Sequence, residues 1–326
     1  MWIIIITILL FFVYIFVLTP YPFVWLLRFK KEEQTEKGPK NINEIKTGLI
    51  IKTNLPYPSA YPQSTFDFYY DPLTPVRHVI VWVHGESFIS GTSAGMKNFG
   101  PMLAKQGYAV CAMNYAYAPR YSFPVQIRQV DEMLCYAKTF MLENYQINLE
   151  GAFLGGDSAG ANISACYATM DANETLASQS KVKLHNSLPI QGLLLFCGPY
   201  DFTEDLQKEE FRQLKTFLKY IGWSYLGHKS WMKRQEKVLA SPLININSHF
   251  PPAYICDGKK FSFMWQGKKL VKVLEEKGID VKSRFYDDMP HEFQFNFVKY
   301  PEESKQVFKE SVAFLDRMTG KEKKEC

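Results

Sequence analysis

A serine in a glycine-rich turn is the residue of this chain best suited to nucleophilic chemistry. Residues 156–160 are Gly-Asp-Ser-Ala-Gly, so Ser158 stands at the centre of a G-x-S-x-G pentapeptide. The short apolar run before it, 151–155, favours a buried strand, and the small apolar run after it, 161–168, favours a packed helix. A strand-to-helix turn this sharp lifts the serine hydroxyl above a sheet and points the helix N-terminus at an oxyanion formed there. The pattern therefore predicts a serine nucleophile.

A serine hydroxyl is a weak nucleophile until a neighbouring base accepts its proton. His291 is the expected base, because it follows the last expected strand, over 281–286, and comes after the serine in the chain. Four other histidines have no such context: His78, His185, His228 and His249. We therefore expect His291 to accept the proton of Ser158 and to return it to the leaving group.

The elements that must position these residues alternate along the chain. Apolar runs predict strands over 78–83, 108–115, 151–155, 193–197, 252–256 and 281–286, and helices over 123–144, 263–277 and 302–318. Near-continuous apolar strands separated by helices indicate an α/β fold, with a mostly parallel sheet and helices on both faces. Sites in such sheets lie at the carboxyl ends of strands. Residues 46–70 and 203–237, which are aromatic and mixed in charge, do not fit the alternation.

Further short motifs occur in a fixed order between about residue 75 and residue 318. They are His84-Gly85 with Phe88 and Gly91, Asn114-Tyr115, Ala118-Pro119, Phe123-Pro124, residues 155–162, Ser241-Pro242, Pro251-Pro252-Ala253 and His291 with Phe293. With these motifs the chain resembles the hormone-sensitive-lipase branch of the α/β-hydrolases, which includes arylacetamide-deacetylase-like proteins and bacterial carboxylesterases. The resemblance implies an α/β-hydrolase fold and ester hydrolysis through an acyl-enzyme, with no metal and no organic cofactor.

The resemblance also implies an oxyanion loop directly after the strand at 78–83. Family members usually have H-G-G-G there, whereas this chain has Glu86 and Ser87 at the third and fourth positions. Other residues can supply backbone N–H donors, although glycine adopts backbone angles that they resist. We expect the Glu86 carboxylate to turn away from the pocket, because it would repel an oxyanion. The expected donors are the N–H groups of Gly85, Glu86, Ser87 and Ala159.

The acid that should orient the histidine is missing from its usual position. In the family it lies in a D-P-L motif about 30 residues before the histidine, where this chain has Phe261. A phenylalanine cannot orient an imidazole or stabilise an imidazolium. Asp257, at the end of the same expected strand, is the favoured substitute, and Asp201, after the preceding strand, is the alternative. A site without any acid would be weakened rather than inactive.

The N-terminal residues 1–27 contain no charged side chain, and residues 2–18 are almost wholly apolar. About 20 apolar residues are enough to span a bilayer. A cleaved signal peptide usually has a basic start and a small-x-small cleavage site, and neither occurs here. We therefore expect an uncleaved, single-pass transmembrane anchor over 1–27.

A charged and polar linker is expected over 28–45, followed by the hydrolase domain over 46–326. Arg28, Lys30 and Lys31 follow the expected span. Because cytoplasmic flanks are enriched in basic residues, these three predict a cytoplasmic catalytic domain.

The bulk composition argues against several function classes. Among 326 residues, 47% are hydrophobic and 22% charged, which is enough for a sizeable core. The net charge of +5 is modest and no basic stripe is interleaved with aromatic residues, so nucleic acid is not an expected partner. The six cysteines form no C-x-x-C pair, and no dinucleotide or phosphate-loop motif occurs. We expect no cofactor and no metal.

The sequence thus predicts a membrane-anchored serine hydrolase that cleaves small or medium acyl esters or acetyl esters, lipophilic ones among them. Residues 203–237 have helical spacing and fit either a cap insertion over the site or a core helix equally well. Two other functions stay open: a degenerate hydrolase that serves as a membrane-tethered binding module, and an amidase or peptidase on the same scaffold. The oligomeric state stays open as well.

Overall fold

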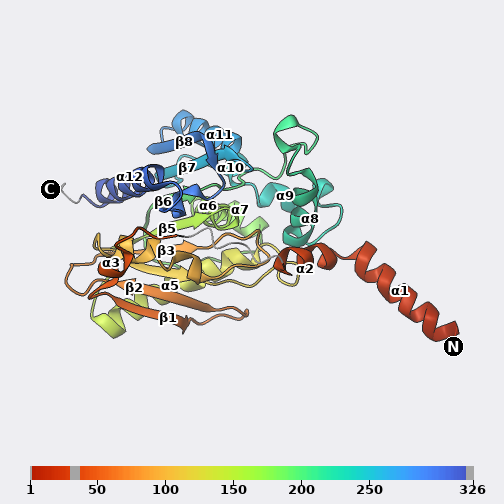
Figure 1. The fold of residues 1–326 in the computed structure, drawn as a ribbon, viewed down its shortest axis with the longest axis horizontal. Helices are drawn as coiled ribbons and strands as arrows, with labels where there is room; N and C mark the ends of the chain where they lie inside the picture. Colours follow the sequence, from red (N-terminus) through yellow and green to blue (C-terminus); the bar gives the residue numbers. More distant parts are fainter. Residues whose placement is uncertain (1, 30–36, 321–326) are drawn as a thin grey trace.

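The computed structural model describes residues 2–29 and 37–320 of the chain. Its centre is an eight-stranded sheet in the order β1-β2-β4-β3-β5-β6-β7-β8 (Figure 1). The strands are β1 (Ile50–Pro56), β2 (Thr65–Tyr70), β3 (His78–Val83), β4 (Ala109–Met113), β5 (Gly151–Asp157), β6 (Ile190–Phe196), β7 (Ala253–Lys260) and β8 (Val281–Pro290). β2 pairs antiparallel with β1 and β4, and the strands from β4 to β8 are parallel.

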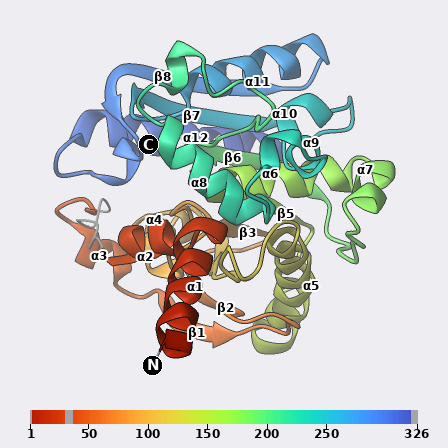
Figure 2. The same cartoon turned by 90° about the vertical axis from the view of Figure 1, so that its right-hand side faces the viewer.

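Helices connect and cover the strands. They are α1 (Trp2–Leu18), α2 (Tyr21–Phe29), α3 (Ile42–Lys46), α4 (Phe99–Ala104), α5 (Val125–Tyr145), α6 (Ala159–Asp171), α7 (Glu174–Gln179), α8 (Lys215–Leu226), α9 (Glu236–Leu239), α10 (Pro242–Asn245), α11 (Met264–Glu276) and α12 (Pro301–Thr319). Short 3-10 turns are η1 (Ser93–Met96), η2 (Glu209–Phe211), η3 (Trp231–Lys233) and η4 (Phe293–Phe295). Figure 2 looks onto one end of the sheet, with α4 on its left and α5 and α6 on its right.

Strand side chains alternate between two cores, one on each face of the sheet. In β3, Val79, Val81 and Val83 pack in the core that also contains residues of α5, α6 and α11. Ile80 and Trp82 pack in the core that contains residues of α4 and α12. Because both faces are covered, β3 is a continuous apolar run rather than an alternation of apolar and polar residues. The expected fold class, a mostly parallel α/β sheet with helices on both faces, is confirmed.

The antiparallel edge formed by β1 and β2 lies in the segment 46–70, which did not fit the expected alternation. β1 is largely exposed, and β2 carries a buried carboxylate, Asp67, which accepts a hydrogen bond from the N–H of Asn54 at 2.8 Å. Neither strand is therefore a continuous apolar run, and for this reason apolar patterning does not predict them.

The N-terminal segment does not form the predicted transmembrane anchor. α1 ends at Leu18 and α2 begins at Tyr21, because a proline at position 20 disfavours helical backbone at the residue before it. The 17 residues of α1 extend about 26 Å, less than the roughly 30 Å of a hydrocarbon core. Within residues 2–29 and 37–320, none of the helices has the length and apolar character that a membrane span needs. The prediction of a transmembrane anchor over 1–27 is therefore wrong, and so is the membrane localisation that was based on it.

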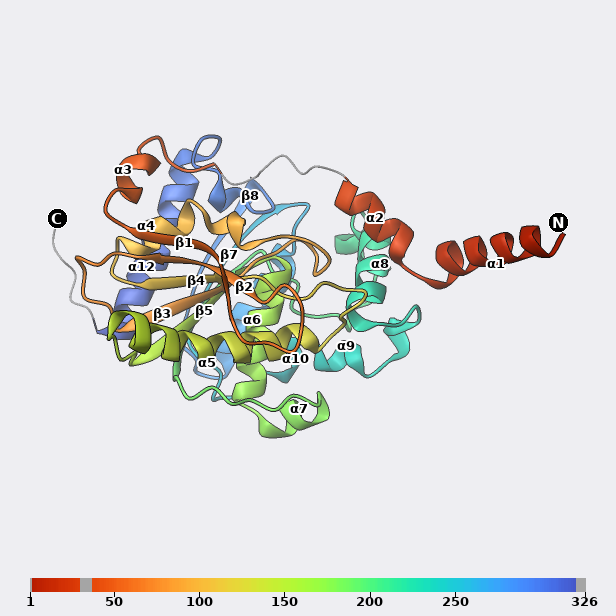
Figure 3. The ribbon, with the colours of Figure 1, turned by 90° about the horizontal axis from the view of Figure 1, so that it is seen from below.

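The second half of the predicted span packs on the hydrolase domain instead. α2 lies beside α8, whereas α1 extends away from the domain (Figure 3). Val24 of α2 is fully buried. The ring of Phe23 stacks on Tyr220 of α8, with 4.6 Å between the ring centroids. The apolar residues of α2 are thus partly used as domain core.

Arg28 also belongs to this folded contact. Its Nε donates to the carbonyl oxygen of Ile89 at 2.8 Å, and its Nη2 donates to that of Ala118 at 3.2 Å. The linker expected over 28–45 therefore begins with a residue that is bonded to the domain. Residues 30–36 of that linker lie outside the described part of the chain.

The different packing of α1 and α2 predicts different effects of truncation. A chain that begins at residue 19 should keep its stability, because α1 is largely exposed. A chain that begins at residue 30 loses the buried Val24 and the Arg28 bonds. Its free energy of unfolding should fall by about 2–5 kcal/mol, the range found when a large buried side chain is lost. Urea unfolding of the two truncated proteins checks this, and equal midpoints would contradict the packing described for α2.

Candidate active site

Ser158 lies at the turn between β5 and α6. Its φ of 50° and ψ of −117° place a non-glycine residue in the left-handed φ region, a strain that costs about 1–3 kcal/mol. Its N–H donates to the carbonyl oxygen of Phe196 on β6 at 2.8 Å, which ties the turn to the neighbouring strand. The residue is 9% exposed, so its side chain is close to the surface of an otherwise buried turn.

Two glycines make this turn possible. A Cβ atom on Gly156 would lie 2.4 Å from the carbonyl carbon of Gly160. A Cβ atom on Gly160 would lie 1.9 Å from the carbonyl oxygen of Val83 at the end of β3. Backbone atoms cannot move aside as a flexible side chain can. The strand and the helix therefore approach so closely that only glycine fits at both positions.

Asp157, directly before the serine, joins three parts of the site. Its Oδ1 accepts a hydrogen bond from Nε1 of Trp82 on β3 at 2.9 Å. It also accepts the N–H of Gly85 in the loop after β3, and it lies beside Glu292, which follows β8. Burial, together with the charge of Glu292, raises the pKa of Asp157 well above its usual value. The position before the serine thus links the turn to both neighbouring loops.

The loop after β3 contains Gly85, Glu86 and Ser87, three of the four residues predicted to donate to an oxyanion, and the fourth, Ala159, is the first residue of α6. Three consecutive residues, Glu86, Ser87 and Phe88, have φ angles of 61°, 61° and 65°. This is the region that glycine occupies without steric cost. The loop therefore has backbone angles that suit glycine at three positions occupied by residues with side chains, which strains it. Gly85 is buried and Glu86 is exposed, so the acidic residue stands at the rim of the loop.

Buried aromatic rings hold the strained loop. The hydroxyl of Tyr115, which follows β4, lies 3.0 Å from the carbonyl oxygen of His84 and 2.9 Å from that of Gly85. The Tyr115 ring stacks on the imidazole of His84 at 4.2 Å. The ring of Phe88 stacks on Tyr225 of α8 at 3.7 Å. Contacts from the segment after β4 and from α8 therefore fix backbone angles that glycine would adopt more easily.

His291 directly follows β8, and its Nδ1 lies 2.7 Å from Oγ of Ser262. The same hydroxyl donates to Oδ1 of Asp257 at 2.5 Å. Asp257 is 2% exposed and accepts two further bonds, from the N–H of Gly258 at 2.7 Å and from that of Phe263 at 3.2 Å. The structure thus brings Asp257, Ser262 and His291 together as a hydrogen-bonded chain.

The pKa of Asp257 is raised to about 6, chiefly by burial. The positive charge of His291 and the bonds from Ser262 and the Gly258 backbone N–H act in the opposite direction. Three further titratable groups face this carboxyl: the thiols of Cys197 and Cys256 and the phenol of Tyr200. Burial raises the pKa of each of them well above its usual value, so they stay protonated. Because its pKa of about 6 lies below 7, the Asp257 carboxyl is mostly ionised at neutral pH.

The other two residues considered for the acid lie elsewhere. Phe261 is 66% exposed and has a φ of 53°, so the loop after β7 turns sharply at this position. The Asp201 carboxylate accepts the N–H of Thr203 at 2.7 Å and its hydroxyl at 2.6 Å. The Asp201 carboxylate therefore stabilises the turn that follows β6.

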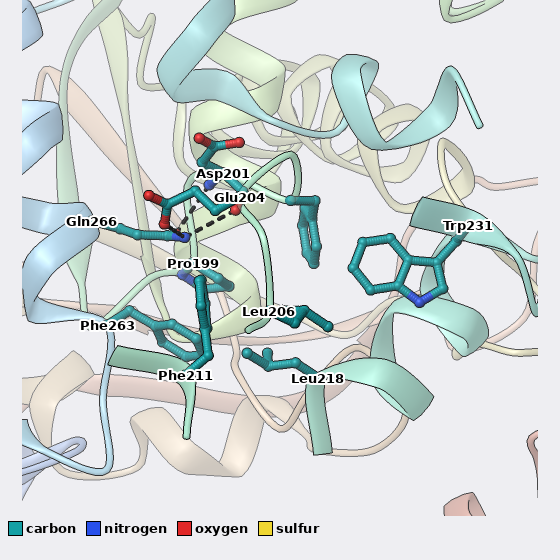
Figure 4. A pocket seen from close by; sticks show the side chains of 10 residues that line it. Pro199, Asp201, Glu204, Leu206, Phe211, Leu218, Trp231, Phe263 and Gln266 are labelled. Atoms are coloured by element: carbon teal, nitrogen blue, oxygen red, sulfur yellow. Dashed lines mark hydrogen bonds between the residues drawn. The ribbon is translucent and has the colours of Figure 1, made fainter. Parts of the chain in front are cut away.

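Asp201 also lines a small hollow between that turn and the start of α11 (Figure 4). Gln266 crosses this hollow, donating to the backbone carbonyl oxygen of Asp201 and to Glu204, both at 2.9 Å. The volume is only about 10 Å³, which is close to the space of one water molecule. A second hollow of about 310 Å³ has Phe261 and Ser262 in its wall. Only the second reaches the size of a small-molecule site.

A metal is a poor fit to these side chains. Cys197, Asp257 and His291 form a cluster within the described residues, with ligand atoms within 4.8 Å of one another. A metal would need the thiolate of Cys197, whose pKa is raised by burial. The carboxyl and the imidazole are already joined through Ser262. The arrangement fits a hydrogen-bonded chain better than a metal centre.

Sequence reasoning missed two contributors to this geometry. The first is Ser262, whose signal in the sequence is a hydroxyl directly after Phe261, the position of the family's acid. The second is Tyr115, which belongs to a sequence motif, but nothing local marks its hydroxyl as a partner of the loop after β3.

Comparisons with known proteins agree with this geometry. A family model described as alpha/beta hydrolase fold matches residues 80–295. Arylacetamide deacetylase of Oryctolagus cuniculus is 30% identical over 98 residues, which is 28% of this chain and 24% of that protein. A probable carboxylic ester hydrolase of Mycobacterium tuberculosis is 25% identical over 195 residues, 59% of this chain and 43% of that protein. The chain thus spans less than half the length of these curated relatives.

Solved structures share the whole fold. An inhibited esterase B from Lactobacillus Rhamnosis superposes with a TM-score of 0.74 at 19% identity, covering 92% of this chain and 97% of that one. A Pyrobaculum calidifontis esterase superposes with a TM-score of 0.68 at 17% identity, covering 91% and 93%. The family match covers more than half of the chain and includes the turn at Ser158 and the segment after β8. The chain therefore belongs to the family with the alpha/beta hydrolase fold.

Proposed function

We propose that this protein is a serine esterase that cleaves carboxylic esters through an acyl-enzyme. The observation that carries the proposal is the strained Ser158 at the N-terminus of α6. The chain that joins His291 to a buried carboxylate supports it further. The names of the curated relatives, an arylacetamide deacetylase and a probable carboxylic ester hydrolase, support an ester substrate.

In the proposed mechanism, Oγ of Ser158 attacks the ester carbonyl carbon while Nε2 of His291 accepts the hydroxyl proton. The carbonyl π electrons move onto oxygen, and the oxyanion is held by backbone N–H groups and the positive end of α6. The proposed donors are Gly85, Glu86, Ser87 and Ala159. When the tetrahedral intermediate collapses, the C–O bond breaks and His291 gives its proton to the alcohol. Water then repeats the sequence on the acyl-enzyme and releases the acid.

Asp257 is the proposed acid of this site. Its carboxylate, fixed by two backbone N–H groups, stabilises the imidazolium that forms on His291 during each proton transfer. Its burial excludes water, which strengthens this electrostatic effect. Asp201 is not proposed for this role, because its carboxylate serves the turn at Thr203.

Residues 203–237 are proposed to form a cap over the acyl side of the site. Within this segment Tyr225 of α8 stacks on Phe88 of the loop after β3. Phe202, directly before the segment, has its ring centroid 6.3 Å from that of Phe88. These rings are buried, so they hold the segment against the loop that contains the proposed oxyanion donors. The ordered loop at residues 86–88 and the buried carboxylate of Asp257 favour a catalytic role over that of a degenerate binding module.

The nucleophile assignment is tested by Ser158→Ala in a p-nitrophenyl butyrate assay. Because the acyl-enzyme cannot form without the hydroxyl, kcat should fall by at least about 10³-fold. Ser178→Ala, which removes an exposed hydroxyl on α7, is the matched control and should leave kcat unchanged. Equal activity of Ser158→Ala and wild type would refute the esterase mechanism.

The acid assignment is tested by comparing Asp257→Asn with Asp201→Asn. We expect Asp257→Asn to lower kcat by about 10²–10⁴-fold, as loss of the orienting acid does in serine proteases. Asp201→Asn changes a turn away from the reacting atoms and should lower kcat by less than about tenfold. The reverse order of the two effects would assign the acid to Asp201.

The raised pKa of Asp257 predicts how activity depends on pH. The carboxyl must be ionised to stabilise the imidazolium, so kcat/KM should fall as the pH is lowered through about 6. In Asp257→Asn this carboxyl no longer titrates, so the part of the pH profile that it sets should be lost and the profile should change shape. A wild-type profile that superposes on that of the variant after scaling would contradict the role given to Asp257.

A further inference from the structure

We infer that Ser262 is a positioning residue through which Asp257 orients His291. The inference deepens the proposed function and rests on it, since it concerns the base of the same site. In place of a direct carboxylate–imidazole pair, the site would then use a relay of Asp257, Ser262 and His291 leading to Ser158.

The geometry supports a relay. The Ser262 hydroxyl lies 2.5 Å from Oδ1 of Asp257 and 2.7 Å from Nδ1 of His291, and both distances suit strong hydrogen bonds. Ser262 and Asp257 are each 2% exposed, so water has little access to either bond. The two contacts leave from the same oxygen atom and therefore couple the carboxylate to the imidazole.

The direction of the hydrogen bonds follows from the chemistry of the groups. An ionised carboxylate can only accept, so the single proton of the Ser262 hydroxyl points toward Asp257. The oxygen of Ser262 is then left to accept from the imidazole, which requires the proton on Nδ1 of His291. Nε2 consequently carries the lone pair. This is the tautomer that a base for Ser158 needs.

The relay also keeps the negative charge close to the imidazole. A carboxylate oxygen of Asp257 and a ring nitrogen of His291 lie within 4.8 Å of one another. In a buried site, a carboxylate at this separation still favours the imidazolium that forms during proton transfer. Ser262 therefore fixes the ring, while Asp257 supplies the charge.

The loop after β7 explains why a serine stands at this place. The backbone turns at Phe261, with a φ of 53°, before α11 begins at Met264. As a result the residue at 261 is 66% exposed, whereas the residue at 262 is 2% exposed. A side chain at 261 in this loop is directed to the surface, and the hydroxyl at 262 occupies the space between strand β7 and the histidine. The carboxylate therefore comes from Asp257 within β7, and the Ser262 hydroxyl lies between it and the imidazole.

The relay is tested by a cycle of Ser262→Ala, Asp257→Asn and the double variant. If Asp257 acts through Ser262, Ser262→Ala should lower kcat for p-nitrophenyl butyrate by about 10²-fold or more, with KM changed by less than about threefold. Adding Asp257→Asn to Ser262→Ala should then lower kcat by less than about threefold further. Effects that multiply in the double variant, or a Ser262→Ala enzyme with wild-type kcat, would overturn the inference.

Two further variants guard against a trivial loss of folding. Ser262→Cys keeps nearly the same volume but bonds weakly, so it should fold like wild type and lose at least about tenfold in kcat. Ser178→Ala, which removes an exposed hydroxyl on α7, is again the control and should leave kcat unchanged. Thermal unfolding of each variant shows whether a loss of activity reflects the site or the fold. A Ser262→Cys protein with wild-type kcat would overturn the inference independently of Ser262→Ala.

A second measurement, covalent labelling of Ser158, tests the relay independently of which substrate the enzyme hydrolyses. The rate at which a fluorophosphonate labels Ser158 depends on the base but not on ester hydrolysis. If wild type is labelled but hydrolyses no ester, the ester function fails, and the relay is judged by whether Ser262→Ala slows the labelling. If Ser262→Ala is labelled as fast as wild type, the relay is refuted while the serine nucleophile stands.

Discussion

The close approach of β5, α6 and the end of β3 is the constraint on which the site depends. With less than 3 Å available to a side chain at Gly156 and Gly160, the backbone has one way to pass from strand to helix. That passage holds Ser158 in the left-handed φ region at the N-terminus of α6, the positive end of the helix dipole. Reactivity of the serine would then follow from backbone packing, before any other side chain contributes.

Strain recurs around this turn and is balanced by burial. Ser158 and residues 86–88 all have positive φ angles without being glycine. Each such residue costs about 1–3 kcal/mol, so the surrounding structure must hold it in place. Tyr115 and Tyr225 do this by hydrogen bonding and stacking on the loop after β3. A loop that lacks the usual glycines can thus keep its shape when Tyr115, which follows β4, and Tyr225 of α8 fix it.

How much of this the sequence predicts depends on how local each feature is. The turn at Ser158 is marked by glycines within two residues of the serine, and apolar runs predict the six strands from β3 to β8, so both features can be predicted from the sequence. The role of Ser262 cannot, because it depends on a loop that turns position 261 outward and position 262 inward. The N-terminal prediction failed for a similar reason. An apolar run has the same composition whether it meets lipid or its own domain, and α2 packs on α8.

The central claim is that Ser158 becomes covalently acylated during ester hydrolysis. Its most direct test is mass spectrometry of the protein after mixing with p-nitrophenyl butyrate and quenching in acid within the first turnovers. The account predicts one butyryl group per chain, located by peptide mapping on Ser158 and missing in Ser158→Ala. Ester turnover without a covalent intermediate, or a butyryl group on another residue, would contradict the mechanism.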